Sequence, residues 1–203
     1  MKYNNGRKIP EYYENPIDNL IINECDKLTA ILYKNNITPN FITIVRLILI
    51  CFTIKSLLYT SEVWFPIIST AIFYFMDCLD GNLARSTNQV TILGDYLDHF
   101  ADLFFIISFI FYMYIKDYDN KIYIFIIFCL FTYLAVLHLG IQQLNYKDLN
   151  QNNDLEQELL DYLNNFHNLD KSNIKWTKYF GSGTIYLIIL IIIYYIQTHL
   201  IQD

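Results

Sequence analysis

Long apolar segments dominate this chain and limit the folds that it can adopt. Five such segments lie at residues 42–59, 63–79, 97–115, 122–141 and 179–201. Each is close to the roughly 20 apolar residues that a helix needs to cross the core of a bilayer. Because 54% of the 203 residues are hydrophobic, the chain is too apolar for an ordinary soluble domain. The sequence therefore predicts an all-α, polytopic membrane helix bundle with five transmembrane helices.

The stretch between the fourth and fifth segments is not predicted to cross the membrane. Residues 142–178 carry many Asn, Asp, Glu and Lys side chains, which are costly in lipid. Five spans would place the C-terminus on the opposite side of the membrane from the N-terminal segment. The alternative is that the last apolar region is divided differently and a sixth span lies within it.

A polar, amphipathic segment precedes the first span. Beyond Pro16, Ile and Leu recur near helical spacing with Asp, Asn and Lys between them. Asn15 can cap such a helix, a proline suits its first turn, and Pro39 ends it. We therefore predict a cytosolic N-terminal segment at residues 1–40, with a helix along the membrane interface, and a membrane-embedded domain at residues 41–203.

The distribution of charge favours one orientation and excludes one class of partner. Most Lys and Arg side chains lie on the N-terminal side of the predicted spans, and only Lys116 and Lys121 lie in the opposite loops. By the positive-inside rule, the N-terminal side faces the cytosol. The formal net charge is −6 and basic residues form no run, so nucleic acid is not a predicted partner.

Four aspartates lie at the ends of the second and third apolar segments, namely Asp77, Asp80, Asp98 and Asp102. Carboxylates at membrane depth are costly, so they indicate a functional site with a cationic partner. The first two are three residues apart and the last two are four apart, so each pair shares one face of a helix. Two such pairs form an all-oxygen cage that suits Mg²⁺ or Mn²⁺ and phosphate chemistry.

The residues around these aspartates follow a pattern with fixed spacing. It reads D-x-x-D-G-x-x-A-R, then eight residues, then G-x-x-x-D-x-x-x-D. Upstream, TPNFIT at residues 38–43 is followed by Arg46 at the start of the first span. Both stretches resemble the CDP-alcohol phosphotransferase family, whose signature agrees with this chain at eight positions, which are Asp77, Asp80, Gly81, Ala84, Arg85, Gly94, Asp98 and Asp102. Members of this family usually have six spans rather than five.

The resemblance implies an enzyme of phospholipid biosynthesis. Such an enzyme transfers a substituted phosphate group from a CDP-linked donor, either CDP-diacylglycerol or a CDP-aminoalcohol, to an acceptor alcohol and releases CMP. One substrate is then a membrane lipid, the active site faces the cytosol, and the resemblance implies a homodimer. It also implies that two ions, Mg²⁺ or Mn²⁺, bind the four aspartates and that Asp102 is also the general base.

Three signature residues are candidates for nucleotide binding by this resemblance. Gly81 lacks a side chain, so a nucleotide can approach its backbone closely, and Ala84 lies one turn further along. Helix packing is the alternative role for both small residues. Arg85 can bind a diphosphate through two parallel hydrogen bonds, or it can extend to the membrane interface without touching substrate.

Polar residues at the start of the first span are further candidates. Asn40 and Thr43 can donate hydrogen bonds to the nucleotide, and Asn40 can equally cap the helix. Arg46 is a cation within the span, so it either offsets the acidic cluster or meets an anionic substrate.

A membrane cation transporter and an inactive family member are the alternative functions. A conducting path favours polar residues through the whole depth of the membrane, whereas these carboxylates gather near one end of their segments. The complete signature argues against a degenerate member of the family. A phosphotransferase is therefore the preferred interpretation of the sequence.

Overall fold

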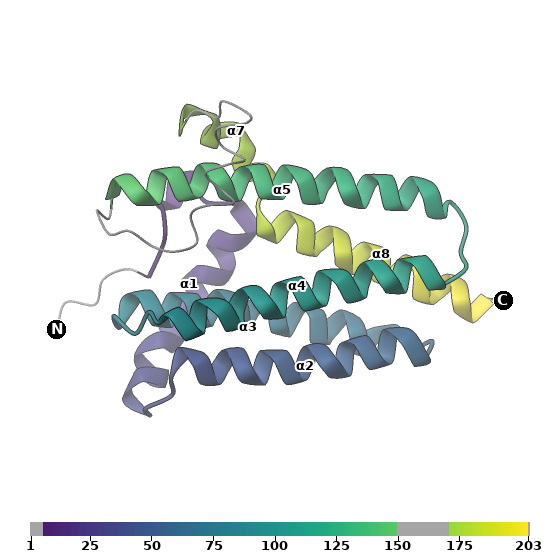
Figure 1. The fold of residues 1–203 in the computed structure, drawn as a ribbon, viewed down its shortest axis with the longest axis horizontal. Helices are drawn as coiled ribbons and strands as arrows, with labels where there is room; N and C mark the ends of the chain where they lie inside the picture. The colour runs from purple at the N-terminus through teal and green to yellow at the C-terminus, as the bar shows by residue number, and fades with distance from the viewer. Residues whose placement is uncertain (1–5, 150–170, 203) are drawn as a thin grey trace.

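The computed structural model describes residues 6–149 and 171–202, and this part of the chain contains helices and no strand (Figure 1). The long helices are α1 (Pro16–Lys34), α2 (Pro39–Tyr59), α3 (Trp64–Ser86), α4 (Ile92–Ile115), α5 (Lys121–Leu149) and α8 (Ser182–Gln202). Short helical turns are η1 (Glu11–Tyr13), η2 (Lys171–Asn173), α7 (Ile174–Thr177) and η3 (Lys178–Phe180). The predicted all-α bundle is confirmed.

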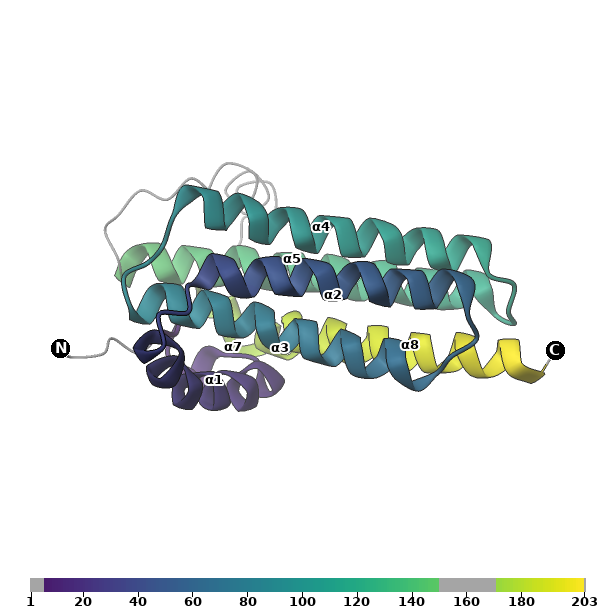
Figure 2. The same ribbon diagram turned by 90° about the horizontal axis from the view of Figure 1, so that it is seen from below.

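The long helices from α2 onward run lengthwise beside one another, whereas α1 lies at one end of them (Figures 1 and 2). α2 packs against α3 and α4, and both α3 and α5 pack against α8. α1 packs against α3 and α8, near the point where α3 ends and α4 begins. The N-terminal helix therefore adjoins the end of the bundle that carries the signature residues.

Four helical stretches are long and apolar enough to cross a membrane, namely Pro39–Tyr59, Ile92–Ile115, Lys121–Gln142 and Ile174–Ile201. They make this chain an integral membrane protein. The four stretches are one fewer than the five spans predicted above. The predicted span at residues 63–79, which lies within α3, is the one that is not among them. The reason is that Asp77, Asp80 and Arg85 lie in the second half of α3 and reduce its mean hydropathy. α3 nevertheless packs along α2.

The polar stretch at residues 142–178, which is predicted not to cross the membrane, lies only partly within the described residues. α5 continues through its beginning and ends at Leu149, while η2, α7 and η3 occupy residues 171–180. Residues 150–170 lie outside the described part of the chain.

Helix starts in the structure follow from local sequence. Asn15 accepts hydrogen bonds from the backbone amides of Ile17 and Asp18, and a proline occupies the first turn of α1, as predicted. Thr38 caps α2 by accepting a hydrogen bond from the amide of Phe41. Local side chains therefore fix where the first two helices begin.

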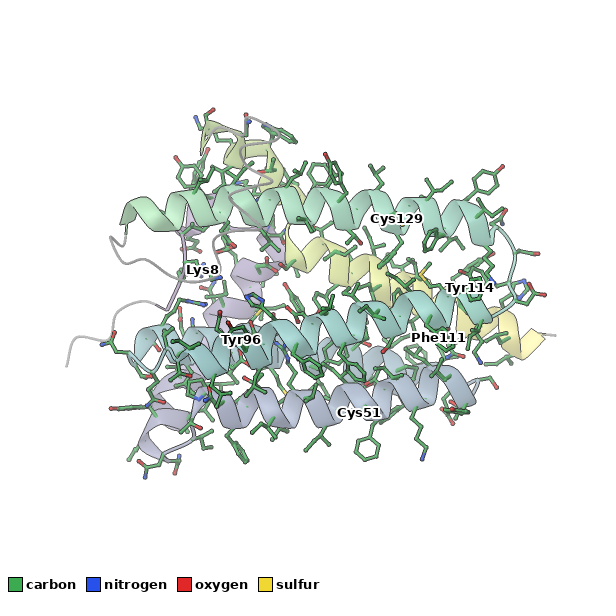
Figure 3. All side chains as sticks on the ribbon, in the orientation of Figure 1. Lys8, Cys51, Tyr96, Phe111, Tyr114 and Cys129 are labelled. Atoms are coloured by element: carbon green, nitrogen blue, oxygen red, sulfur yellow. The ribbon has the colours of Figure 1, made fainter. Side chains whose placement is uncertain are left out.

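Aromatic packing fills the interior of the bundle beyond the signature residues. Phe73 of α3 meets Phe105 of α4 edge to face, with ring centroids 4.5 Å apart. The buried aromatic residues of this cluster include Phe73, Phe105, Phe109, Tyr112 and Phe128. The outer faces of the same helices carry exposed apolar side chains, among them those labelled in Figure 3 as Cys51, Phe111, Tyr114 and Cys129. These outward faces suit contact with lipid.

Candidate active site

Three of the four predicted metal ligands converge where α3 faces α4. Asp77 comes from the second half of α3, whereas Asp98 and Asp102 lie one turn apart in the first half of α4. Each side chain offers one carboxylate oxygen, and these oxygens lie within 4.8 Å of one another. Clustered carboxylates are hard oxygen donors, so this group can hold a divalent cation of the Mg²⁺ type.

The guanidinium of Arg46 lies within this carboxylate cluster. Arg46 is fully buried, and its Nη1 forms ion pairs with Asp77 and, at 2.9 Å, with Asp98. Its Nη2 lies 3.1 Å from a carboxylate oxygen of Asp102. A buried cation offsets the repulsion among carboxylates that lie this close together. Of the two roles that the sequence allows for Arg46, the structure supports the one in which it offsets the acidic cluster.

Asp80 is the fourth predicted ligand, and it is not one of the three clustered carboxylates. It is 4% exposed, and its Oδ2 accepts a hydrogen bond from the hydroxyl of Thr43 at 2.7 Å. Thr43, a predicted nucleotide contact, thus binds a signature carboxylate across the α2–α3 interface. Its position lets it orient Asp80, which lies one turn after Asp77 on the same face of α3.

Arg85 lies over Gly81 on the same helix. A Cβ atom at Gly81 would lie 3.0 Å from Nη1 of Arg85, so the glycine gives the guanidinium room. The Nε of Arg85 donates a hydrogen bond to the main-chain oxygen of Gly6 at 2.6 Å. Both Arg85 and Gly81 line the cavity beside the carboxylates, whereas the half-buried Ala84 does not.

Asn40 joins the start of α2 to the start of α4. Its Nδ2 lies 3.5 Å from the hydroxyl of Thr91, which is the residue before α4. A Cβ atom at Gly94 would lie only 2.6 Å from Oδ1 of Asn40, so the signature glycine gives this side chain room to lie against the start of α4. The capping alternative for Asn40 is wrong, because Thr38 provides the N-terminal cap of α2. Asn40 is also not among the cavity residues.

A cavity of about 240 Å³ adjoins the carboxylate cluster. Signature residues form one wall, which contains Asp77, Gly81, Arg85, Asp98 and Asp102. The N-terminal segment forms another wall, which contains Lys8, Glu14, Asp18 and Ile22. In the view of Figure 3, Lys8 lies between α4 and α5. A concave space beside converging polar groups is a typical substrate site.

The sequence profile of a family described as CDP-alcohol phosphatidyltransferase matches residues 36–201, which is more than half of the chain. The chain belongs to this family. No solved structure matches it.

A curated relative within the CDP-alcohol phosphatidyltransferase family comes from Blochmanniella floridana. It is described as "CDP-diacylglycerol--glycerol-3-phosphate 3-phosphatidyltransferase" and is 36% identical to this chain over 74 residues. The aligned part is 34% of this chain and 38% of the relative. The similarity thus spans well under half of the length of the relative.

The N-terminal wall of the cavity precedes the part of the chain that the CDP-alcohol phosphatidyltransferase profile matches. Its two acidic side chains, Glu14 and Asp18, are 3% and 7% exposed. Burial raises the pKa of Glu14 to about 7, and Asp18 adds to this shift while Arg7 opposes it. Burial also raises the pKa of Asp18 to about 6, against the hydrogen bond that it accepts from the hydroxyl of Tyr74.

Sequence reasoning missed Lys8, Glu14 and Asp18 as site residues. The sequence predicted a capped amphipathic helix after Asn15 and shows charged residues around the start of that helix. Both are features of residues that are neighbours in the chain. Neither feature indicates that this segment lines the signature cavity. That placement depends on contacts that are distant in sequence, such as the hydrogen bond of 2.7 Å from Nδ2 of Asn15 to the main-chain oxygen of Lys178.

Proposed function

We propose that this protein is a metal-dependent phosphotransferase of phospholipid biosynthesis. It transfers a substituted phosphate group from a CDP-linked donor to the hydroxyl of an acceptor alcohol and releases CMP, and one of the two substrates is a membrane lipid. The description of the relative names CDP-diacylglycerol, which supports this donor. A CDP-aminoalcohol is the other donor class that the family signature allows.

The observation that carries this proposal is the carboxylate cluster beside its cavity. Asp77, Asp98 and Asp102 hold three of the signature positions, their oxygens lie within 4.8 Å of one another, and all three line the cavity. Cation transport is less well supported, because a conducting path needs polar groups through the depth of the bundle. Further along the bundle, the buried polar residues of the described chain include Thr53, Ser69, Thr70 and Gln197, which carry no charge, and they lie beside a large aromatic and aliphatic cluster.

In this proposal the signature carboxylates have two roles. Asp77, Asp80, Asp98 and Asp102 hold two divalent cations, Mg²⁺ or Mn²⁺, and Asp102 also takes the proton from the acceptor hydroxyl. When bound, the cations supply positive charge that neutralises the diphosphate and the leaving CMP. Arg46 keeps the carboxylates together in the absence of substrate.

The remaining predicted residues act on the nucleotide directly or through a neighbour. We propose that Gly81, Ala84 and Arg85 form the nucleotide side of the site, with Arg85 binding the diphosphate through its planar guanidinium. Thr43 and Asn40 act indirectly, through the carboxylate and the helix start that they contact. A loss of nucleotide affinity in an Arg85→Lys variant, measured by titration with the donor, tests this assignment.

We also propose that the cavity faces the cytosol. The N-terminal segment and α3 bring Lys8 and Arg85 to this end of the bundle, whereas Lys116 and Lys121 lie at the other end. A reporter inserted at the exposed Asn88, in the turn between α3 and α4, should therefore be accessible from the cytosolic side. Exclusive access from the opposite side would overturn this orientation.

CMP release from the purified full-length chain tests the proposed reaction. We expect release that requires Mg²⁺ or Mn²⁺, stops in excess EDTA and is lost in an Asp77→Asn variant. The matched control is Asp117→Asn, an exposed carboxylate just after α4, which should release CMP at the rate of the unmodified protein. Release in EDTA would contradict the metal requirement, and the absence of release from every donor and acceptor would overturn the proposed activity.

A further inference from the structure

The wall of the cavity that faces the signature is built by residues that precede the family match. That match begins at residue 36, whereas Lys8, Glu14 and Asp18 line the same cavity as Asp98 and Asp102. The signature residues account for the diphosphate and the reacting hydroxyl in the proposed reaction. Residues outside the signature are therefore the ones available to recognise the part of the substrate that varies.

The N-terminal wall is held firmly in place. Ile9 is 2% exposed and packs with Ile141 and Ile174 in a small buried cluster. Asn15 caps α1 with its Oδ1, and its Nδ2 donates to the main-chain oxygen of Lys178 at 2.7 Å and to the hydroxyl of Thr184 at 2.9 Å. A wall with these contacts presents its side chains in a fixed geometry, which selective binding requires.

Two buried carboxylates and an aromatic ring give this wall a preference for cations. Glu14 accepts a hydrogen bond from Nε2 of Gln142 at 2.9 Å, and Asp18 accepts one from the hydroxyl of Tyr74. Tyr74 lines the cavity between the two walls, and its ring stacks on that of Tyr186 with centroids 4.0 Å apart. Two buried carboxylates that line one cavity favour an ammonium group, which they can bind through charge-assisted hydrogen bonds.

Two basic residues line the cavity, Lys8 on the N-terminal wall and Arg85 on the signature wall, and both lie near signature residues. Arg85 lies over Gly81 of the signature and also donates to the main-chain oxygen of Gly6. Lys8 lies near enough to Asp102 for their charges to interact. Once these two cations face the diphosphate of the donor, the lining residues of the described chain supply no further Lys or Arg for a second phosphate. An acceptor that carries a phosphate would therefore meet Glu14 and Asp18, which repel it.

We propose that Glu14, Asp18 and Tyr74 bind the protonated amino group of an amino alcohol, and this assignment rests on the proposed function. The amino alcohol is either the free acceptor for CDP-diacylglycerol or the head group of a CDP-linked donor. In the first case its hydroxyl oxygen forms a bond to the phosphorus that bears diacylglycerol, the bond from that phosphorus to CMP breaks, and Asp102 takes the proton. In the second case the hydroxyl of diacylglycerol attacks the phosphorus that bears the amino alcohol, with the same leaving group and the same base.

CMP release by the purified full-length protein at pH 8, with Mg²⁺ present, separates these cases. One arm supplies CDP-diacylglycerol with ethanolamine, serine or glycerol 3-phosphate, and the other supplies CDP-ethanolamine with diacylglycerol. Release with an amino alcohol in either arm, and little release with glycerol 3-phosphate, is the expected result. Release with glycerol 3-phosphate alone overturns this inference and leaves the proposed function intact, whereas no release in any arm overturns both.

Two conservative variants test the assignment of the residues. Glu14→Gln and Asp18→Asn should each raise the KM for the amino-alcohol substrate about tenfold or more, with a smaller change in kcat, because a charge-assisted hydrogen bond is lost. Glu11→Gln is the matched control, since Glu11 lies in the same segment but is exposed and does not line the cavity. An unchanged KM in both variants, or an equal loss of kcat with KM preserved, would overturn the amino-group site.

Discussion

The two walls of the cavity contain similar acidic side chains but compensate them differently. On the signature wall, Asp77, Asp98 and Asp102 surround the buried guanidinium of Arg46, so one full positive charge offsets part of the charge of the cluster. On the N-terminal wall, Glu14 and Asp18 receive hydrogen bonds from neutral groups. Because three carboxylates face one guanidinium, the signature wall keeps a negative charge that metal cations can neutralise. The carboxylates of the N-terminal wall are bonded to neutral groups, so a cationic substrate can pair with them.

The two walls of the cavity are also positioned by different contacts. The signature wall is formed by long helices of the bundle, and its residues follow helical spacing within α3 and α4. The N-terminal wall is positioned by the packing of α1 against α3 and by hydrogen bonds to α5, η3 and α8, all of which are remote in the sequence. We therefore expect changes on the first wall to affect chemistry and global stability, and changes on the second to affect selectivity and local stability.

The largest effect is expected for the proposed base. Asp102→Asn keeps the size of the side chain and one oxygen but cannot accept a proton, so the rate of CMP release should fall by about 10²–10⁴-fold. Donor affinity should change much less, which a donor titration and a single-turnover measurement can compare. If Asp102→Asn turns over at a near-normal rate, another group activates the acceptor hydroxyl.

Removal of the Arg46 guanidinium from the signature wall should cause the largest loss of stability. Arg46→Gln leaves three neighbouring carboxylates without their buried partner, so the free energy of unfolding should fall by about 3–5 kcal/mol in EDTA. Adding Mg²⁺ or Mn²⁺ should raise the Tm of the variant more than that of the unmodified protein, because a cation can replace the missing charge. Equal metal-induced shifts in Tm would contradict this role for Arg46.

A change of pH should act mainly on the N-terminal wall. The pKa of Glu14 is raised from 4.5 to about 7 and that of Asp18 from 3.8 to about 6, so the docked segment binds protons more readily than a released one. Its docking is therefore most stable below the ordinary pKa values of 3.8 and 4.5, and it loses that stability as the pH rises from there through 6 to 7. Arg7 and Arg85, which also face Glu14, reduce the shift without reversing it.

Hydrogen exchange measures this effect directly. After correction for the intrinsic exchange rate, amides of the segment before α1 should be protected roughly 10²–10³-fold more at pH 5 than at pH 8, because docking raises the pKa values of both Glu14 and Asp18 by about two units and each unit is a tenfold change in equilibrium. The double variant Glu14→Gln with Asp18→Asn is the control and should lose the pH dependence. Greater protection at pH 8 in the unmodified protein would show that the carboxylates are not destabilised by burial.

The smallest effect is expected for the cap that holds the N-terminal wall. Asn15→Ala removes the hydrogen bonds to the first turn of α1 and to Lys178 and Thr184, so it should cost about 1–2 kcal/mol of stability. The KM for the amino-alcohol substrate should rise with it, because Glu14 precedes the cap directly. Asn35→Ala at the other end of α1 is the comparison, and it should leave that KM unchanged.

The sequence predicted that the signature carboxylates converge, and three of the four do, but it predicted the details of their contacts only in part. Helical spacing placed Asp98 and Asp102 on one face of α4, as expected, and the packing of the helices brings Asp77 of α3 to them. The spacing did not distinguish Asp80, which binds Thr43, from the clustered three. That distinction depends on the side chains that α2 presents, and the spacing within α3 contains no information about them.

The sequence by itself determined that this chain is an all-α membrane protein with an acidic phosphate-transfer signature, because hydropathy and helical spacing are local properties. Only the tertiary structure decided that Arg46 lies among the carboxylates and that Glu14 and Asp18 line the same cavity. These arrangements depend on contacts such as that between Asn15 and Lys178, which are 163 residues apart. Packing of this kind is set by the shape and polarity of distant surfaces, so no local pattern in the chain specifies it.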